Sequence, residues 1–211
     1  MFTITQTFCL GFVVATLAAQ APERKVSHQV LSSRSLPAAD LIFDDRFKYA
    51  GAQRFELYGV ADAEQHFFVD ANDAGEVRRL CWIQFEHYLP SNVHRYDYKM
   101  TTTTEIGGLR FLYDTRLYTD YSALRPDPDS DGDRGRRLLQ AKGFKLPKAA
   151  LRVRLIHLPN ADNRSELMII YLDAIDPSGL PPNAVNEMTP ESGVASILLD
   201  HLGHALKIKR P

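Results

Sequence analysis

The chain has 211 residues, enough for one domain with a sizeable core, and its 25 Lys and Arg nearly balance its 26 Asp and Glu. With 45% hydrophobic and 24% charged residues, the composition is that of a folded globular protein and excludes an intrinsically disordered chain. Two cysteines exclude a disulfide-stapled mini-protein, and a formal net charge of −1 gives no overall attraction to nucleic acid or to anionic membranes.

The first 22 residues carry no Asp, Glu, Lys or Arg and contain an apolar run, Phe8 to Ala19. A run of about 12 apolar residues is too short for a transmembrane helix and is typical of the central region of a signal peptide. Small residues occupy the −3 and −1 positions of a cut after Ala21, so we predict a signal peptide over 1–21 and a secreted or periplasmic protein. Met1 to Thr7 lacks the usual Lys or Arg, which leaves the apolar first helix or strand of a cytosolic protein as the alternative. No later stretch is long and apolar enough for a transmembrane helix.

Residues 22–40 are polar and contain four serines and two prolines, so we expect an N-terminal extension with little fixed structure. A single domain over 41–211 should follow. From residue 41 to about residue 118, apolar and polar residues alternate, which is typical of strands with one buried face. The turns between these segments predict an antiparallel meander with strands at 54–60, 65–70, 76–89, 96–104 and 109–117.

The second half of the chain adds helices. Residues 133–142 are predicted as a short helix, and strands at 151–158 and 166–174 follow, of which the second is apolar without alternation and should be central. Thr189 can cap a C-terminal amphipathic helix whose apolar residues recur at helical spacing up to Leu206. The predicted fold class is therefore α+β: a single antiparallel β-meander sheet of about seven strands, with the short helix and the C-terminal helix packed on one face.

Pairing of the first three strands in sequence order would give the sheet two different faces. One is apolar and would form the core: Phe55, Leu57, Phe67, Val69, Val77, Ile83 and Phe85. The other mixes polar and aromatic residues: Arg54, Glu56, Tyr58, His66, Phe68, Asp70, Trp82, Gln84, Glu86 and Tyr88. Such a mixture suits a small-molecule pocket, and we therefore predict as ligand-binding residues Tyr58, Trp82, Gln84, Glu86 and Tyr88. A solvated outer face stabilised by cross-strand pairs is the alternative.

Glu86 and His66 are the candidate acid and base on the same mixed face. Desolvation beside Trp82 would raise the pKa of the Glu86 carboxyl group, and histidine side chains exchange protons near neutral pH. Their presence on one face would permit a small cofactor-free enzyme, provided that the strand register brings them together.

Four aspartates in the segment 127–133 resemble the start of a calcium-binding loop. Asp127, Asp129, Asp131 and Asp133 occupy positions 1, 3, 5 and 7, and a glycine occupies position 6. Position 12 is a leucine, so the bidentate carboxylate is missing, and several arginines follow the loop. The alternative to calcium is that Ser130, or one of the last two aspartates, caps the following helix.

Other residues give weaker signals. His201 and His204 lie three residues apart on the last predicted helix, beside Asp200, but no third metal ligand is identifiable, which favours histidines at the core boundary. Cys81 lies in an apolar strand and should be a buried hydrophobic residue. The chain contains no nucleophile elbow, Walker A loop, dinucleotide-binding glycine motif or His-Glu-x-x-His motif.

These observations favour an exported, non-catalytic domain that binds a small or apolar ligand on the face of its sheet and needs no cofactor. The cofactor-free enzyme with Glu86 and His66 is one alternative. A protein–protein interaction module that uses the sheet face or the N-terminal extension is the other.

Overall fold

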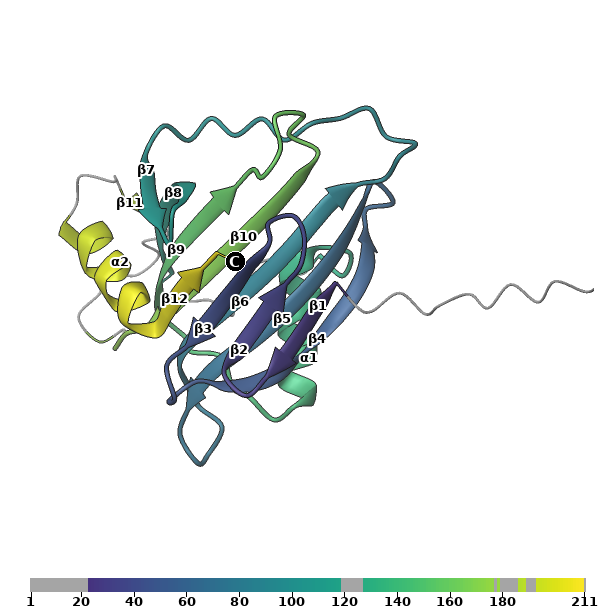
Figure 1. Cartoon of the computed structure of the whole chain (residues 1–211). Helices are drawn as coiled ribbons and strands as arrows, with labels where there is room; N and C mark the ends of the chain where they lie inside the picture. The colour runs from purple at the N-terminus through teal and green to yellow at the C-terminus, as the bar shows by residue number, and fades with distance from the viewer. Residues whose placement is uncertain (1–22, 119–126, 177, 179–185, 189–192, 211) are drawn as a thin grey trace, which may run out of the picture.

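The computed structural model describes residues 23–118, 127–176, 178, 186–188 and 193–210, and these residues form two antiparallel sheets and two helices (Figure 1). The predicted signal peptide and the predicted cap at Thr189 lie outside the described residues.

The larger sheet is antiparallel throughout. In spatial order its strands are β11 (Asn186–Met188), β8 (Leu109–Tyr118), β9 (Ala150–His157), β10 (Ser165–Ala174), β6 (Val77–Tyr88), β5 (Ala61–Ala71) and β4 (Lys48–Leu57), and β7 (Thr103–Ile106) also pairs with β8. Consecutive strands pair within two groups, β4 to β6 and β8 to β10. The groups join where β6 pairs with β10. The predicted α+β class and antiparallel sheet are confirmed.

β10 lies in the middle of this sheet, as its unbroken apolar run predicted. Every residue from Ser165 to Leu172 is buried, because other parts of the fold cover both faces of the sheet. The strand predicted over 96–104 is mostly wrong, since regular pairing begins only at Thr103. Tyr96 and Tyr98 instead turn their hydroxyl groups onto carboxyl groups of the sheet.

The smaller sheet consists of β1 (Arg24–Ser27), β2 (Val30–Ser33), β3 (Ala39–Phe43) and β12 (Leu206–Lys209), in that order. Residues 24–33 therefore have a fixed structure, contrary to the prediction of a loosely structured extension. These strands are short, and in β2 only Leu31 has a large side chain that is fully buried. Serine and charged residues fill the remaining positions, so the apolar alternation is too brief to identify a strand in the sequence.

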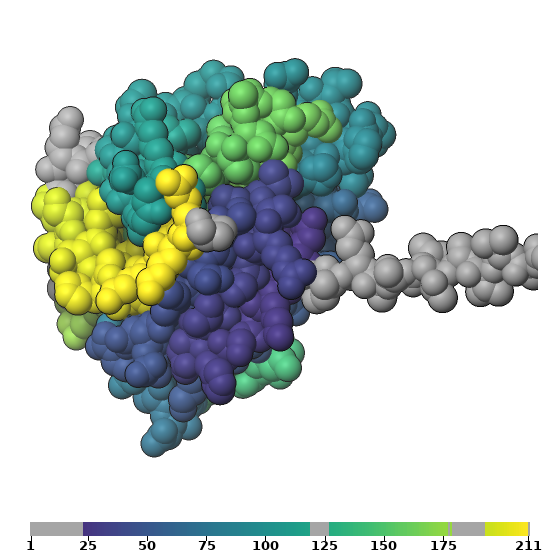
Figure 2. Space-filling model, viewed as in Figure 1, coloured from purple at the N-terminus to yellow at the C-terminus, as the bar shows by residue number. Residues whose placement is uncertain are grey.

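The C-terminal helix α2 (Gly193–Ala205) ends one residue before Leu206, the last residue of the predicted apolar stripe. Lys207 and Lys209 belong to β12 and do not close the helix, because Leu206 and Ile208 alternate with them and pack inward. β12 pairs with β3, so the C-terminal strand completes a sheet whose other strands come from residues 24–43, and in Figure 2 its yellow atoms lie beside the purple and dark blue atoms of that sheet.

Two apolar clusters pack against the larger sheet, one on each face. The smaller sheet and α2 cover one face, which we call the small-sheet face; Phe68 of β5 stacks there on Phe43 of β3, with ring centroids 3.6 Å apart. The helix α1 (Asp131–Ala141) covers the other, which we call the α1 face, where Leu139 packs near Phe67 and Trp82. The molecule is thus layered, with the larger sheet between the two coverings (Figure 1).

Replacing Gly107 with alanine should lower the free energy of unfolding by about 2 kcal/mol. Gly107 has φ +58° in the β7–β8 turn, and a Cβ atom there would collide with the backbone oxygen of Ile208 in β12. Urea denaturation measures the effect. Gly203 of α2 is the matched control, because its added Cβ would meet nothing within 4 Å and an alanine should be neutral or stabilising. Equal effects of the two substitutions would contradict this account of the turn.

Candidate functional site

The pairing register of β5 and β6 places on opposite faces of the sheet residues that were predicted to share one face. His66 is opposite Ile83, and Phe67 is opposite Trp82, because the pairing slips by one residue at the end of β5. Even-numbered residues of β5 therefore share a face of the sheet with odd-numbered residues of β6. The prediction that His66 and Glu86 share one face is wrong: His66 lies on the small-sheet face and Glu86 on the α1 face.

Four of the five predicted ligand-binding residues occupy alternate positions of β6 and share the α1 face, namely Trp82, Gln84, Glu86 and Tyr88. Tyr58 lies apart from them, exposed in the turn after β4. The face is closed, since Trp82 is 6% and Gln84 is 0% exposed beneath α1 and its neighbouring segments. An open ligand-binding face is therefore not present at these two residues.

A buried network of polar side chains occupies the α1 face. Gln84 donates hydrogen bonds to Glu86 Oε2 (2.7 Å) and to Asp131 Oδ2 (3.3 Å), and Gln65 donates to Gln84 Oε1 (2.8 Å). The hydroxyl group of Tyr96 donates to Glu86 Oε1 (2.6 Å). Because Asp131 is the first residue of α1, these bonds fix the start of that helix to the sheet.

Glu86 is paired across the strands with Glu166 of β10, so two carboxyl groups meet in the interior. Glu166 is 2% exposed, and its Oε2 accepts a hydrogen bond from the Tyr98 hydroxyl at 2.5 Å. Burial raises the pKa of both carboxyl groups, and the adjacent charge of Glu86 helps to raise that of Glu166 to about 8. The pair therefore keeps a proton at neutral pH. The raised pKa of Glu86 agrees with the sequence prediction, but its partner could not be found without the pairing of β6 with β10.

His66 has a different set of partners on the small-sheet face. Its Nε2 lies 2.9 Å from Glu64 Oε1, and its Nδ1 lies 3.2 Å from the Tyr49 hydroxyl. Burial would raise the pKa of Glu64, but hydrogen bonds from His66 and Arg54 and the charge of Arg24 lower it to about 2. The carboxylate is thus ionised and accepts a hydrogen bond from Nε2, while Nδ1 is hydrogen bonded to the Tyr49 hydroxyl. Both ring nitrogens are occupied, and the 4% exposure of His66 leaves no room for a substrate.

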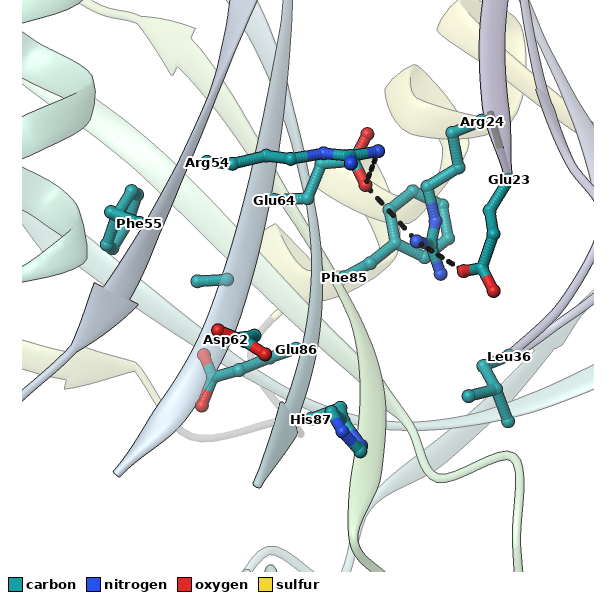
Figure 3. Close-up of a pocket in the computed structure, with 11 residues that line it drawn as sticks. Glu23, Arg24, Leu36, Arg54, Phe55, Asp62, Glu64, Phe85, Glu86 and His87 are labelled. Carbon is teal, nitrogen blue, oxygen red and sulfur yellow. Dashed lines mark hydrogen bonds and ion pairs between the residues drawn. The ribbon is translucent and has the colours of Figure 1, made fainter. Parts of the chain in front are cut away.

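A groove of about 550 Å³ lies between the smaller sheet and the ends of β4, β5 and β6 (Figure 3). The smaller sheet and its β2–β3 connection contribute Glu23, Arg24 and Leu36. The strands contribute, among others, Arg54, Asp62, Glu64, Phe85 and His87. The groove therefore combines apolar surface with charged groups of both signs, and the sequence could not reveal it because five separate segments form its walls.

Arg24 organises one wall of this groove. Its Nη1 donates to Glu64 Oε2 (3.2 Å), which also pairs with Arg54 Nη2 (2.9 Å), and its guanidinium group lies 4.1 Å above the Phe85 ring. The Arg24 side chain is only 10% exposed. This wall is rigid, because Glu64 is held at the same time by His66 from within the sheet. Asp62, in contrast, is exposed and makes no side-chain hydrogen bond or ion pair with a described residue.

The four aspartates predicted as calcium ligands have separate partners. Asp127 accepts from the Tyr58 hydroxyl (2.8 Å), Asp129 pairs with Arg134, Asp131 accepts from Gln84, and Asp133 pairs with Arg136. The alternative, a helix cap, is confirmed: the Ser130 hydroxyl accepts from the Asp133 amide (3.1 Å). Across the described part of the chain, no group of three or more His, Cys, Asp or Glu residues is arranged to hold a metal ion.

Comparison of the chain with protein-family models, with curated proteins and with solved structures finds no match. Neither helix of the described residues is long and apolar enough to cross a membrane. Cys81 is a free thiol that is fully buried, and burial raises its pKa, as expected for an inert core residue.

Proposed function

We propose that the protein binds a small molecule in the groove between its two sheets. The observation that carries this proposal is a cavity of about 550 Å³ that combines the apolar Leu36 and Phe85 with charged side chains. Ligand pockets typically have volumes of roughly 300–1,000 Å³ and combine an apolar lining with a few polar groups that orient the ligand. The ligand expected here is compact and polar, with an apolar part.

The preformed wall supports binding more than catalysis. Arg24, Glu64 and Arg54 are fixed by one another, so a ligand would meet polar groups that need little rearrangement. The acid and base considered from the sequence lie on opposite faces of the sheet and cannot act on one substrate. A binding function therefore agrees better with the geometry than the enzymatic alternative does.

Asp62→Trp should abolish ligand binding in the groove, because an indole at this exposed lining position would fill the space. A thermal-shift screen with a library of small polar metabolites provides the measurement. Ligands should raise the Tm of the wild-type protein and of the control Asp40→Trp, but not that of Asp62→Trp. Asp40 is an exposed aspartate on β3 that does not line the groove, so it controls for an added surface indole. If no compound stabilises the wild-type protein, or if compounds stabilise all three proteins equally, the groove is not the binding site.

We also propose that the chain is exported, with cleavage after Ala21. The apolar run in the first 22 residues supports this, and such a cut would leave Arg24 and its contacts in the groove intact. Intact-mass spectrometry of the protein from its native host should show the loss of residues 1–21. A retained N-terminus would contradict export by this route.

A further inference from the structure

A second cleft, which shares no lining residue with the groove, contains His201 and His204. It has a volume of about 620 Å³ and lies where the end of β10, the start of β6 and the second half of α2 meet. Asp173 and Ala174 come from β10, Arg78 and Arg79 from β6, and Asp200, His201 and His204 from α2, while Arg46 comes from the turn after β3.

Both imidazole rings are oriented by bonds at Nδ1. His201 Nδ1 lies 2.6 Å from Asp173 Oδ2, and His204 Nδ1 lies 2.9 Å from the backbone oxygen of Asp200. A carboxylate and a carbonyl oxygen only accept, so each Nδ1 carries a proton. Neither Nε2 is hydrogen bonded to a residue that the structure describes, and each therefore remains available to a ligand.

Asp44 and Asp70, which do not line the cleft, bind its three arginines. Arg78 and Arg79 both use Nε and Nη2 to bind the buried carboxylate of Asp70, which is 1% exposed. Arg46 uses Nε to bind Asp44 at 2.6 Å. Nη1 of Arg78 and of Arg79, and both Nη atoms of Arg46, make no hydrogen bond with a described residue. The free side of each guanidinium group thus offers donors to a ligand that can accept several hydrogen bonds.

The donors that line the cleft suit an anion better than a metal ion. Three arginines line it; of the four carboxylates around them, Asp44 and Asp70 bind the arginines, and Asp173 and Asp200 lie beside the histidines. Two histidines alone provide too few ligands for a typical zinc site, and guanidinium groups repel a cation. A small oxyanion would accept charge-assisted hydrogen bonds from the guanidinium groups, and Nε2 can share a hydrogen bond with it when one of the two carries a proton.

We propose that this cleft binds a phosphate group, as free phosphate or as a phosphate monoester, between Arg46, Arg78, Arg79 and His201. His201 contacts the ligand through Nε2, and Asp173 is the positioning residue that orients the ring. The site is independent of the groove, so either can be present without the other.

Isothermal titration with inorganic phosphate and with glycerol phosphate tests the site on the full-length protein. Arg46→Gln should weaken the binding of either compound about tenfold, because a charge-assisted hydrogen bond is lost. Arg34→Gln, at an exposed arginine outside the cleft, should leave the affinity unchanged. Weaker binding by glycerol phosphate than by phosphate would identify the free ion as the ligand, and the reverse would identify the monoester.

Two substitutions of His201 distinguish a direct contact between its side chain and the ligand from a purely structural role. Asn can keep the donor at the Nδ1 position that faces Asp173 but lacks Nε2, whereas Gln can keep a donor near the Nε2 position. His201→Asn should therefore weaken phosphate binding at least fivefold, and His201→Gln should weaken it less, with both variants retaining the wild-type Tm. The proposal is overturned if the wild-type protein binds neither compound at millimolar concentration, if Arg34→Gln weakens binding as much as Arg46→Gln, or if His201→Asn binds normally.

Discussion

Replacing Glu166 with glutamine should raise the free energy of unfolding by about 3 kcal/mol near pH 8.5 and change it little near pH 5. Glutamine keeps an oxygen that can accept from the Tyr98 hydroxyl, and its amide group can donate toward Glu86. The substitution therefore removes an ionisable group from the interior with little loss of hydrogen bonding.

The direction of this effect follows from the raised pKa of Glu166, which is about 8 in the folded protein against an ordinary value of 4.5 for a glutamate carboxyl group. Between these two values the folded state binds more protons than the unfolded state, so wild-type stability falls as the pH rises through this window. The stabilisation is complete below the unfolded pKa and is lost above the folded one. The variant cannot ionise at this position, and its stability should depend less on pH.

Urea denaturation at the two pH values measures the difference. Glu105→Gln is the control, since Glu105 is exposed on β7 and its substitution should not alter the pH dependence. A Glu166→Gln variant that is destabilised equally at both pH values would contradict the conclusion that Glu166 and Glu86 retain a proton at neutral pH.

Phe68→Ala should lower the free energy of unfolding by about 4 kcal/mol, within the range for truncating a fully buried phenylalanine. The Phe68 ring is 0% exposed, stacks on Phe43 of the smaller sheet and lies 5.1 Å from the Tyr49 ring. It is therefore a principal contact between the two sheets. Hydrogen exchange should show the largest loss of protection in β1, β2, β3 and β12.

Phe67→Ala is the matched control on the same strand. Phe67 is equally buried but faces the other way, near Trp82 and under Gly135 of α1. Its truncation should be comparably destabilising and should expose α1 to exchange while sparing the smaller sheet. If the two variants lose protection in the same elements, the two sides of the larger sheet do not open separately.

The sequence predicted the parts of the fold that depend on local pattern. Alternation located β5, β6 and β8, and the uninterrupted apolar run identified β10 as central. Desolvation beside aromatic residues correctly indicated a raised pKa for Glu86. These features depend on neighbours along the chain, so they are readable from residue order alone.

Features that depend on pairing between distant segments were missed. A one-residue slip near the end of β5 placed His66 on the opposite face from Glu86, and no property of either residue signals it. The contact between Glu86 and Glu166 requires β6 to pair with β10. The groove and the phosphate cleft each combine several segments, and their residues resemble ordinary surface charges in the sequence.

The pairing of β12 with β3 has a consequence for how the chain acquires its structure. Asp40 pairs with Lys209, so the smaller sheet cannot be completed until residues 206–209 have left the ribosome. Until then the edge of β3 stays open, and a strand edge of this kind can pair with other chains. Contacts so distant in sequence are typical of proteins that fold in roughly milliseconds to seconds. β12 therefore covers a strand edge that would otherwise be open to association with other chains.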